Sequence, residues 1–231
     1  MKRVVFRSVV AFGLLLVVAV ALVALTLRAS LPELDGEFVV SGLVDRASIE
    51  RDDDGIPVIT ASGRRDLAFA TGFVHGQDRF FQMDTIRRQA AGELSEIVGS
   101  IAIEKDKRSR FHRFRSRART VIANAMDDDR ALLVAYADGV NAGLTSLDAR
   151  PFEYFALGAE PQPWLPEDSV LVVFAMYMQL NDPRASKDVQ RGLAHRLLPG
   201  KVYEWLYPQG TPWDAPLMGE PRPLVAIPDA D

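Results

Sequence analysis

The sequence has no cysteine among its 231 residues. This absence excludes disulfide bonds, thiolate nucleophiles and cysteine-based zinc sites within the chain, and it suits an extracytoplasmic protein that folds without oxidation. Histidine is scarce as well: His75, His112 and His195 lie far apart, and none has the spacing of a metal-binding pair. We expect each of the three to be a packing or surface residue rather than a catalyst.

An excess of one charge is also lacking, because the formal net charge is −4 and the isoelectric point lies near 5.5. Nothing in this balance predicts a nucleic-acid binder. One stretch, Lys105–Arg119, carries eight Lys or Arg residues. A nucleic-acid site usually adds accessible aromatic residues or a recognisable module. The apolar residues here recur at helical spacing, so we expect a solvated helix face that lies on a partner chain or near anionic lipid.

The chain lacks the short motifs of common active sites. It contains no G-x-S-x-G elbow, no H-E-x-x-H helix, no phosphate-binding loop and no G-x-G-x-x-G turn. The sequence alone therefore predicts no complete active site and no catalytic residue within these 231 residues.

The N-terminal segment, residues 1–30, is predicted to direct export. Lys2, Arg3 and Arg7 precede Val9–Leu27, a run of nineteen residues without charge. A removable secretory leader has a shorter apolar core, whereas a membrane-spanning helix needs about 20 residues. The run is compatible with both, and small residues such as Ala21 could serve a signal peptidase. The positive charges favour a cytoplasmic N-terminus, so a periplasmic or extracytoplasmic body is expected, either released or anchored through residues 9–27.

Apolar residues recur every three to four positions from Asp66 to Gly99, which predicts helix. Asp66 is the expected N-cap and Gly99 the expected end. Gly72, Gly76 and Gly92 each weaken a helix by about 1 kcal/mol relative to alanine, so we expect two or three helices joined by kinks rather than one rod.

Several charged residues interrupt this pattern and must lie close to the core. A buried carboxylate needs an ion-pair or hydrogen-bond partner. Two pairings are open: Asp78 with Arg79, or Asp84 with Arg87 and Arg88. We interpret them as residues that fix helix packing rather than as a chemical site.

The remaining elements are predicted from turn and capping signals. Strands are expected at Leu43–Ile49 and Ile56–Ala61, joined by a charged turn that lacks the closing glutamate of a calcium loop. Trp164 is expected to anchor a proline-bounded connector. Helices are expected at residues 127–147, 166–180 and 186–198, and a Pro-rich extended tail at residues 208–231.

Several motifs, in order, resemble the opening of the penicillin acylase family. They are RDDDGIPVITA at Arg51–Ala61, GFVHGQDRFFQM at residues 72–83, YADGVNAGL at Tyr136–Leu144 and EPQPWLPEDSVLV at Glu160–Val172. One departure is Gly76, where the family usually has alanine. The resemblance makes residues 31–207 an α-chain domain of α+β class, mainly helical, in which a few strands join the β-chain sheets of a four-layer αββα N-terminal-nucleophile hydrolase.

The resemblance also implies a function for the assembled protein. Family members are made as one precursor that cuts itself into α and β chains, and the nucleophile is the new N-terminal serine of β, with its own amino group as base. The expected reaction is hydrolysis of linear amides, such as penicillin side-chain amides or N-acyl homoserine lactones. This chain alone would be inactive without its β-chain partner. The rival interpretations are a truncated, non-catalytic α-like protein and a membrane-anchored helical interaction protein.

Two sets of site residues follow from the resemblance by position. The substrate's acyl group would meet the end of the helix after the P-W-x-P-E-D segment, at Met176, Tyr177, Gln179 and Leu180. Helix core is an equally good interpretation of Met176 and Leu180. A structural calcium ion, if bound, would take one α-chain carboxylate, which is Asp188 or is lost to Lys187 depending on the alignment. One carboxylate cannot hold calcium by itself, so the other ligands would come from the β chain.

Overall fold

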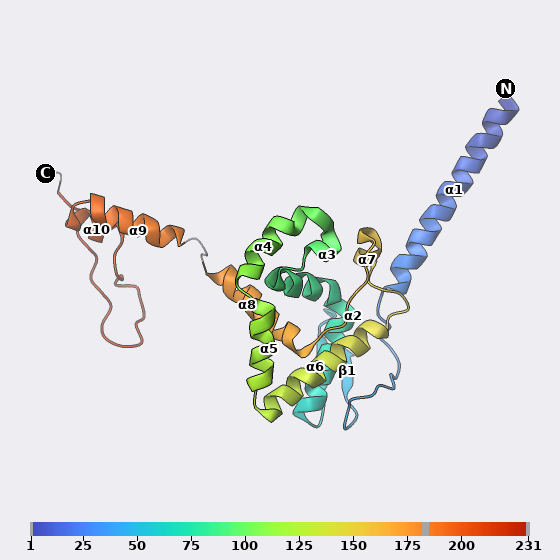
Figure 1. The fold of residues 1–231 in the computed structure, drawn as a ribbon, viewed down its shortest axis with the longest axis horizontal. Helices are drawn as coiled ribbons and strands as arrows, with labels where there is room; N and C mark the ends of the chain where they lie inside the picture. Colours follow the sequence, from blue (N-terminus) through green and yellow to red (C-terminus); the bar gives the residue numbers. More distant parts are fainter. Residues whose placement is uncertain (1, 182–184, 230–231) are drawn as a thin grey trace. The chain divides into compact units, whose positions relative to one another are not determined.

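The computed structural model describes residues 2–181 and 185–229. It separates into two compact units, Met1–Met176 and Tyr177–Asp231, which are described in turn. The chain is mainly helical, with one two-stranded sheet in the described residues (Figure 1).

Helix α1 covers Lys2–Ala29. Within the described residues it is the one helix long and apolar enough to cross a membrane, over Ala11–Ala29, and none of that stretch is buried in the protein. Its last residue is tied to the body, because the Ala149 amide donates a hydrogen bond to the Ala29 carbonyl at 3.0 Å. The predicted apolar helix is therefore present, and it meets the body directly at its C-terminal end.

The predicted hairpin forms from β1, Ser48–Arg51, and β2, Pro57–Thr60, which pair antiparallel with Ile49 opposite Ile59. The Asp52 carboxylate caps the charged turn by accepting the amide of Ile56 at 2.8 Å. The first strand begins five residues later than predicted. The reason is that the amides of the preceding residues, Val44 and Asp45, donate to Asp66 instead of to a strand partner.

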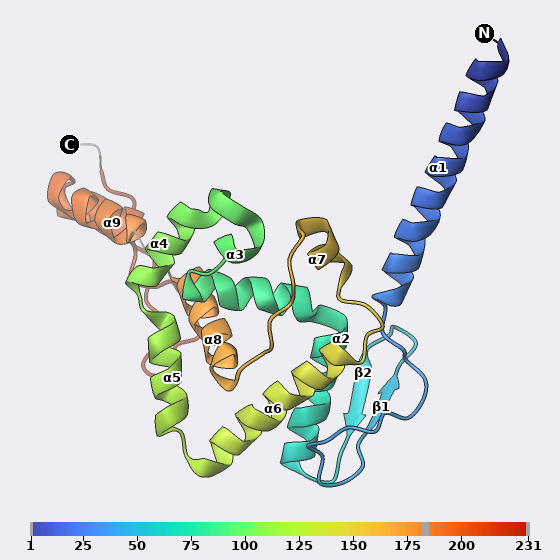
Figure 2. The same ribbon diagram turned by 45° about the vertical axis from the view of Figure 1, so that its right-hand side comes forward.

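Helix α2 is continuous over Arg64–Ala91, through Gly72 and Gly76, and its ribbon bends partway along rather than forming one straight rod (Figure 2). The N-cap prediction was wrong, since Gly63 occupies that position, and the buried Asp66 carboxylate accepts the amides of Val44 and Asp45. The third glycine does end the helix: Gly92 has φ 74°, the left-handed conformation that glycine adopts without strain.

The helix continues through its glycines because α6, Asp127–Thr145, packs directly on them (Figure 2). An added Cβ at Gly72 would lie 2.2 Å from the carbonyl oxygen of Tyr136, and one at Gly139 would lie 2.0 Å from that of Phe69. Gly76 and Gly143 repeat these contacts one turn along. The glycines let the backbones of α2 and α6 come into contact, whereas larger side chains would hold the helices apart. The close contact adds van der Waals attraction between the two helices.

After Gly92 come α3 (Ser95–Val98), a 3₁₀ turn (Gly99–Ala102), α4 (Ile103–Phe111) and α5 (Phe114–Asn124). The basic stretch is thus two helices and not one, because Arg113 between them has φ 53°, a left-handed conformation that ends the helix. Asp106 is buried and accepts the amides of Leu94 and Ser95 at 3.0 and 2.7 Å. It anchors α4 to the start of α3.

Helix α7 covers Phe152–Leu157 and α8 covers Pro166–Leu180. Trp164, in the connector between them, is 1% exposed and confirms the predicted anchor. Its backbone exchanges two hydrogen bonds with the Asn141 side chain, at 2.7 and 2.9 Å. Trp164 belongs to a core cluster with Phe80, Ala137, Val140 and Tyr154.

The second unit holds α9, Ser186–Leu197, and α10, Gly200–Leu206. These bounds agree with the predicted helix at 186–198. From Pro208 to Pro228 the chain has neither helix nor strand, as the proline content predicts.

Candidate functional site

The predicted acyl-binding residues lie on a helix whose first turns are fixed by buried charges. The arrangement depends on a connected set of three arginines and four carboxylates, here called the arginine–carboxylate network: Asp84, Arg87, Arg88, Glu93, Glu96, Arg115 and Asp168.

Asp84 is the part of this network closest to the core. It is fully buried and accepts hydrogen bonds from Arg87 at 2.7 Å, from Arg88 at 2.9 Å and from the Tyr154 hydroxyl at 2.6 Å. Of the two pairings left open by the sequence, Asp84 with the two arginines is therefore present. Asp78 pairs with Arg51 at 2.9 Å rather than with Arg79, and so ties the hairpin to α2.

Burial raises the pKa of the Tyr154 phenol, and the Asp84 carboxylate, which accepts a hydrogen bond from the phenol, raises that pKa further. Burial by itself would lower the pKa of Arg88, but hydrogen bonds and charge from Asp84 and Glu96 outweigh it and the pKa is raised. The arginine therefore stays charged and the phenol neutral at any physiological pH. These groups satisfy one another, which suits a scaffold rather than proton transfer.

Asp168 extends the network to the first turn of α8. Its buried carboxylate accepts from Arg87 Nη1 at 2.5 Å, from Arg115 Nη1 at 2.6 Å and from the amide of Leu165 at 2.8 Å. The Arg87 guanidinium also donates to the carbonyl of Pro163 and lies 5.0 Å from the Trp164 ring centroid. One buried carboxylate thus joins α2, α5 and the start of α8.

The far end of α8 is bare. Met176, Tyr177 and Leu180 are 53%, 59% and 77% exposed, and Gln179 is also exposed. Met176, Gln179 and Leu180 share one face of the helix, since they are spaced by three and four residues. The helix-core interpretation of Met176 and Leu180 is therefore wrong for this chain by itself, and the acyl-pocket assignment stays a prediction.

Asp188 lies in the first turn of α9 and is exposed, as is Lys187 beside it. Within residues 2–181 and 185–229, no group of three or more His, Cys, Asp or Glu side chains could hold a metal ion. A lone exposed carboxylate supplies one or two of the six to eight oxygens that calcium takes. The residues present therefore do not form a calcium site on their own, and the assignment to Asp188 stays a prediction.

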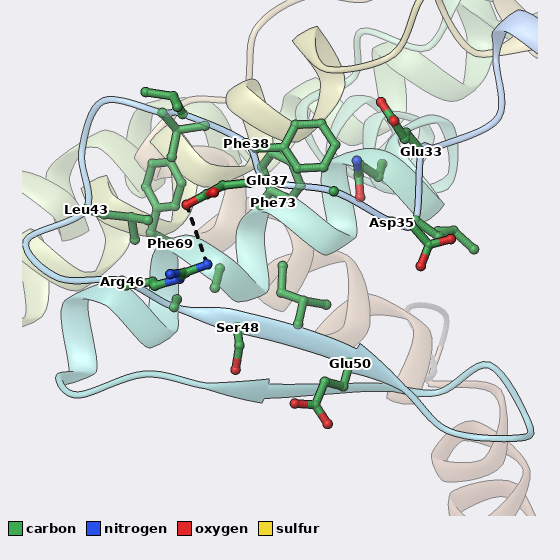
Figure 3. Close-up of a pocket in the computed structure, with 18 of the residues that line it drawn as sticks. Glu33, Asp35, Glu37, Phe38, Leu43, Arg46, Ser48, Glu50, Phe69 and Phe73 are labelled. Carbon is green, nitrogen blue, oxygen red and sulfur yellow. Dashed lines mark ion pairs between the residues drawn. The ribbon is translucent and has the colours of Figure 1, made fainter.

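Sequence reasoning missed a cavity of about 910 Å³ between the segment that precedes β1 and helix α2 (Figure 3). Phe38, Phe69 and Phe73 form its apolar wall, and the Phe38 and Phe73 rings lie 5.3 Å apart. Carboxylates also line the cavity, at Glu33, Asp35, Glu37 and Glu50, with Arg46 3.5 Å from Glu37. The acidic residue at every second position from 33 to 37 was the available signal in the sequence.

The three histidines have aromatic neighbours. His75 lies beside Tyr136, with Nδ1 2.8 Å from the phenol oxygen, His112 stacks on Phe114 and His195 meets the edge of Tyr203. Burial lowers the pKa of His75, against the effect of Asp78, and burial raises the pKa of Tyr136 to about 12. Both therefore remain neutral near pH 7, as packing residues do.

Comparison with known proteins identifies the family to which the sequence is similar. The sequence model described as Penicillin amidase matches residues 46–216. Penicillin acylase 2 proenzyme of Pseudomonas sp. (strain SE83) is 42% identical over 147 residues, which are 64% of this chain and 19% of that protein. Acyl-homoserine lactone acylase QuiP of Pseudomonas aeruginosa is 36% identical over 162 residues, 68% of this chain and 19% of that protein. The chain thus spans about a fifth of the length of these relatives.

A solved structure gives the same indication for the fold. Thermostable penicillin G acylase from Alcaligenes faecalis superposes with a TM-score of 0.60 at 23% identity, covering 78% of this chain and all of the matched chain.

Proposed function

Since this chain belongs to the penicillin amidase family, we propose that it is the α-chain portion of an extracytoplasmic acylase that hydrolyses linear amides. The whole matched chain of a penicillin G acylase lies within the length covered here, and one relative is named a proenzyme. Both facts support a precursor that is processed into two chains. In this proposal the partner is the β chain of the same precursor, and its N-terminal serine takes the acyl group.

The observation that carries the proposal is the construction of α8. Its start is fixed by Asp168 between Arg87 and Arg115, and its end presents Met176, Gln179 and Leu180 without cover. A rigid helix with an apolar free end is suited to form one wall of an acyl pocket whose other wall comes from a second chain.

The chemistry in this assignment is acyl transfer. The serine oxygen attacks the amide carbonyl, the amine leaves with a proton, and water then releases the carboxylic acid from the serine ester. An α-amino group has a pKa near 7.7–8.0, so a useful fraction is neutral and can act as base at neutral pH. In this proposal, residues 1–231 contribute binding and position, and the β chain contributes the reacting groups and the rest of the four-layer αββα fold.

Activity should therefore require both chains. We expect the full precursor to process itself and to release acid from N-acyl amides, while residues 1–231 alone release none above background. The measurement is product formation by chromatography, with penicillin G and N-acyl homoserine lactones as substrates. Turnover by residues 1–231 alone would contradict the proposal, and so would a full-length gene product that folds, stays uncut and shows no hydrolysis.

The free end of α8 should select the acyl group. In the processed enzyme, Leu180→Ala removes three carbons from the proposed wall, and we expect the kcat/KM ratio between short and long linear acyl groups to change about 10-fold or more. Leu197→Ala on α9 is the matched control, because it is the same substitution at a leucine of similar exposure, 71% against 77%. It should change that ratio by less than about twofold. If the two substitutions change the ratio equally, Leu180 does not line the acyl pocket.

A further inference from the structure

Helix α1 ends where the body begins, with no spacer between them. The Ala149 amide holds the Ala29 carbonyl, and Ser30 and Leu31 already line a second cavity, of about 690 Å³. This cavity lies between the chain after α1, the hairpin turn, α2 and the start of α7. The last residue of α1 is thus joined to the body by a backbone hydrogen bond, with no intervening linker.

Exposed apolar side chains surround the foot of the helix. Four of them, here called the apolar collar, line this cavity and are between 50% and 65% exposed: Leu31, Leu34, Ile56 and Phe152. They come from three separate stretches of chain, so folding has gathered them beside α1. Large exposed apolar groups that cluster in this way mark contact with another apolar phase or partner.

The helix itself fits a bilayer. Its apolar stretch, Ala11–Ala29, has 19 residues with a mean hydropathy of 2.4. At 1.5 Å per residue it spans about 28 Å, close to the roughly 30 Å hydrocarbon core. Its apolar side chains are exposed on all sides, as lipid contact requires, whereas a soluble helix buries one face.

Removal of the helix as a leader fits the structure less well. A removable leader has an apolar core of about 7–15 residues followed by small residues. Cleavage after Ala21 would leave Leu22, Val23, Leu25 and Leu27, all exposed, on the mature protein. Cleavage after Ala29 would need a small residue at position 27, which is leucine, and would break the helix end that Ala149 holds.

We propose that α1 is retained as a membrane anchor and that the apolar collar at its foot rests in the interfacial layer of the same bilayer. The basic residues ahead of the apolar stretch, Lys2, Arg3 and Arg7, place the N-terminus in the cytoplasm, so the body lies against the outer face of that membrane. The occupant of this surface is lipid, and the collar continues the apolar surface of the helix onto the body.

Retention is tested on the full precursor with its native N-terminus. We expect the intact mass of the processed chain to include residues 2–29, and the protein to stay with the membrane after alkaline carbonate extraction. A variant in which a cleavable secretory leader replaces residues 2–29 should be soluble and should hydrolyse a soluble amide at the native rate. A native chain that lacks these residues, or that is extracted into the soluble fraction, would overturn the proposal even if the replaced variant failed to fold.

The collar is tested separately by lipid contact. Because this chain has no cysteine, Leu34→Cys or Phe152→Cys can carry a single fluorophore once any cysteine outside residues 1–231 is changed to serine. In vesicles of phosphatidylethanolamine and phosphatidylglycerol with brominated acyl chains, we expect strong quenching at both positions. Met126→Cys is the control, since Met126 is exposed and directly precedes α6, whose length of about 28 Å separates it from the end of α6 nearer to Ala149.

Quenching at the collar but not at Met126 supports the proposal. Absence of quenching at both collar positions in a protein whose α1 is inserted would show that water or the second chain covers the collar. That result would leave the acylase assignment untouched.

Discussion

Replacing Gly139 by alanine is expected to destabilise the processed enzyme by about 3 kcal/mol or more. The new Cβ would lie 2.0 Å from the backbone carbonyl oxygen of Phe69, a distance that real Cβ atoms essentially never show. A backbone carbonyl inside a helix cannot move away as the end of a flexible side chain can. Helices α2 and α6 would therefore have to separate where they are in contact. Gly72→Ala should behave in the same way, because its Cβ would meet the carbonyl of Tyr136 at 2.2 Å.

The control for this prediction has the opposite sign. Gly192 lies inside α9 with nothing within 4 Å of an added Cβ. Gly192→Ala should therefore stabilise its helix by up to about 1 kcal/mol, as alanine does in open helices. The measurement is the thermal midpoint of the two-chain enzyme, together with the yield of processed protein. Similar midpoints for Gly139→Ala and Gly192→Ala would mean that the two helices are not in backbone contact.

Asp168→Asn is the second large effect that we expect, a loss of roughly 3–5 kcal/mol of folding stability. The carboxylate is fully buried and accepts from two arginines, so its neutralisation takes one charged hydrogen-bond partner from Arg87 and one from Arg115. Asparagine has nearly the same side-chain volume as aspartate and keeps one of its oxygens. A loss of stability would therefore come from the missing charge and not from a cavity. Since Asp168 also holds the start of α8, any folded fraction should show altered acyl preference.

Glu167→Gln provides the matched comparison. Glu167 is the adjacent residue, and it pairs at 3.3 Å with an Arg119 side chain that is 64% exposed. Ion pairs in such solvated positions contribute less than about 1 kcal/mol. Chemical denaturation of the two-chain enzyme, followed by activity and fluorescence, separates the variants. If Asp168→Asn unfolds at the same denaturant concentration as Glu167→Gln, the network does not hold α8.

The sequence pattern predicted most helices because their buried faces recur at helical spacing. It gave no sign that Gly72 and Gly76 are contact points for α6: helix propensity counts glycine only as weakening, whereas α6 packs where the Cβ is missing. The break at Arg113 was missed because nothing in the local sequence marks an arginine that adopts a left-handed conformation.

The site was predicted less completely. The pairing of Asp84 with Arg87 and Arg88 followed from three- and four-residue spacing on one helix. Asp168, 81 residues further along than Arg87, could not be connected to it without the fold. The cavity beside Phe38 was missed because its acidic wall comes from irregular chain. The acyl-binding and calcium residues came from the family resemblance, since neither spacing nor composition singles them out.

The two ends of α8 differ in what a mutation there would cost. Asp168 and Leu171 are buried in the core, whereas Tyr177, Gln179 and Leu180 in the last turn are exposed. Substitutions in this outer turn should therefore change what the helix end contacts, which in the proposed acylase is the acyl group, while the buried first turn keeps the protein folded.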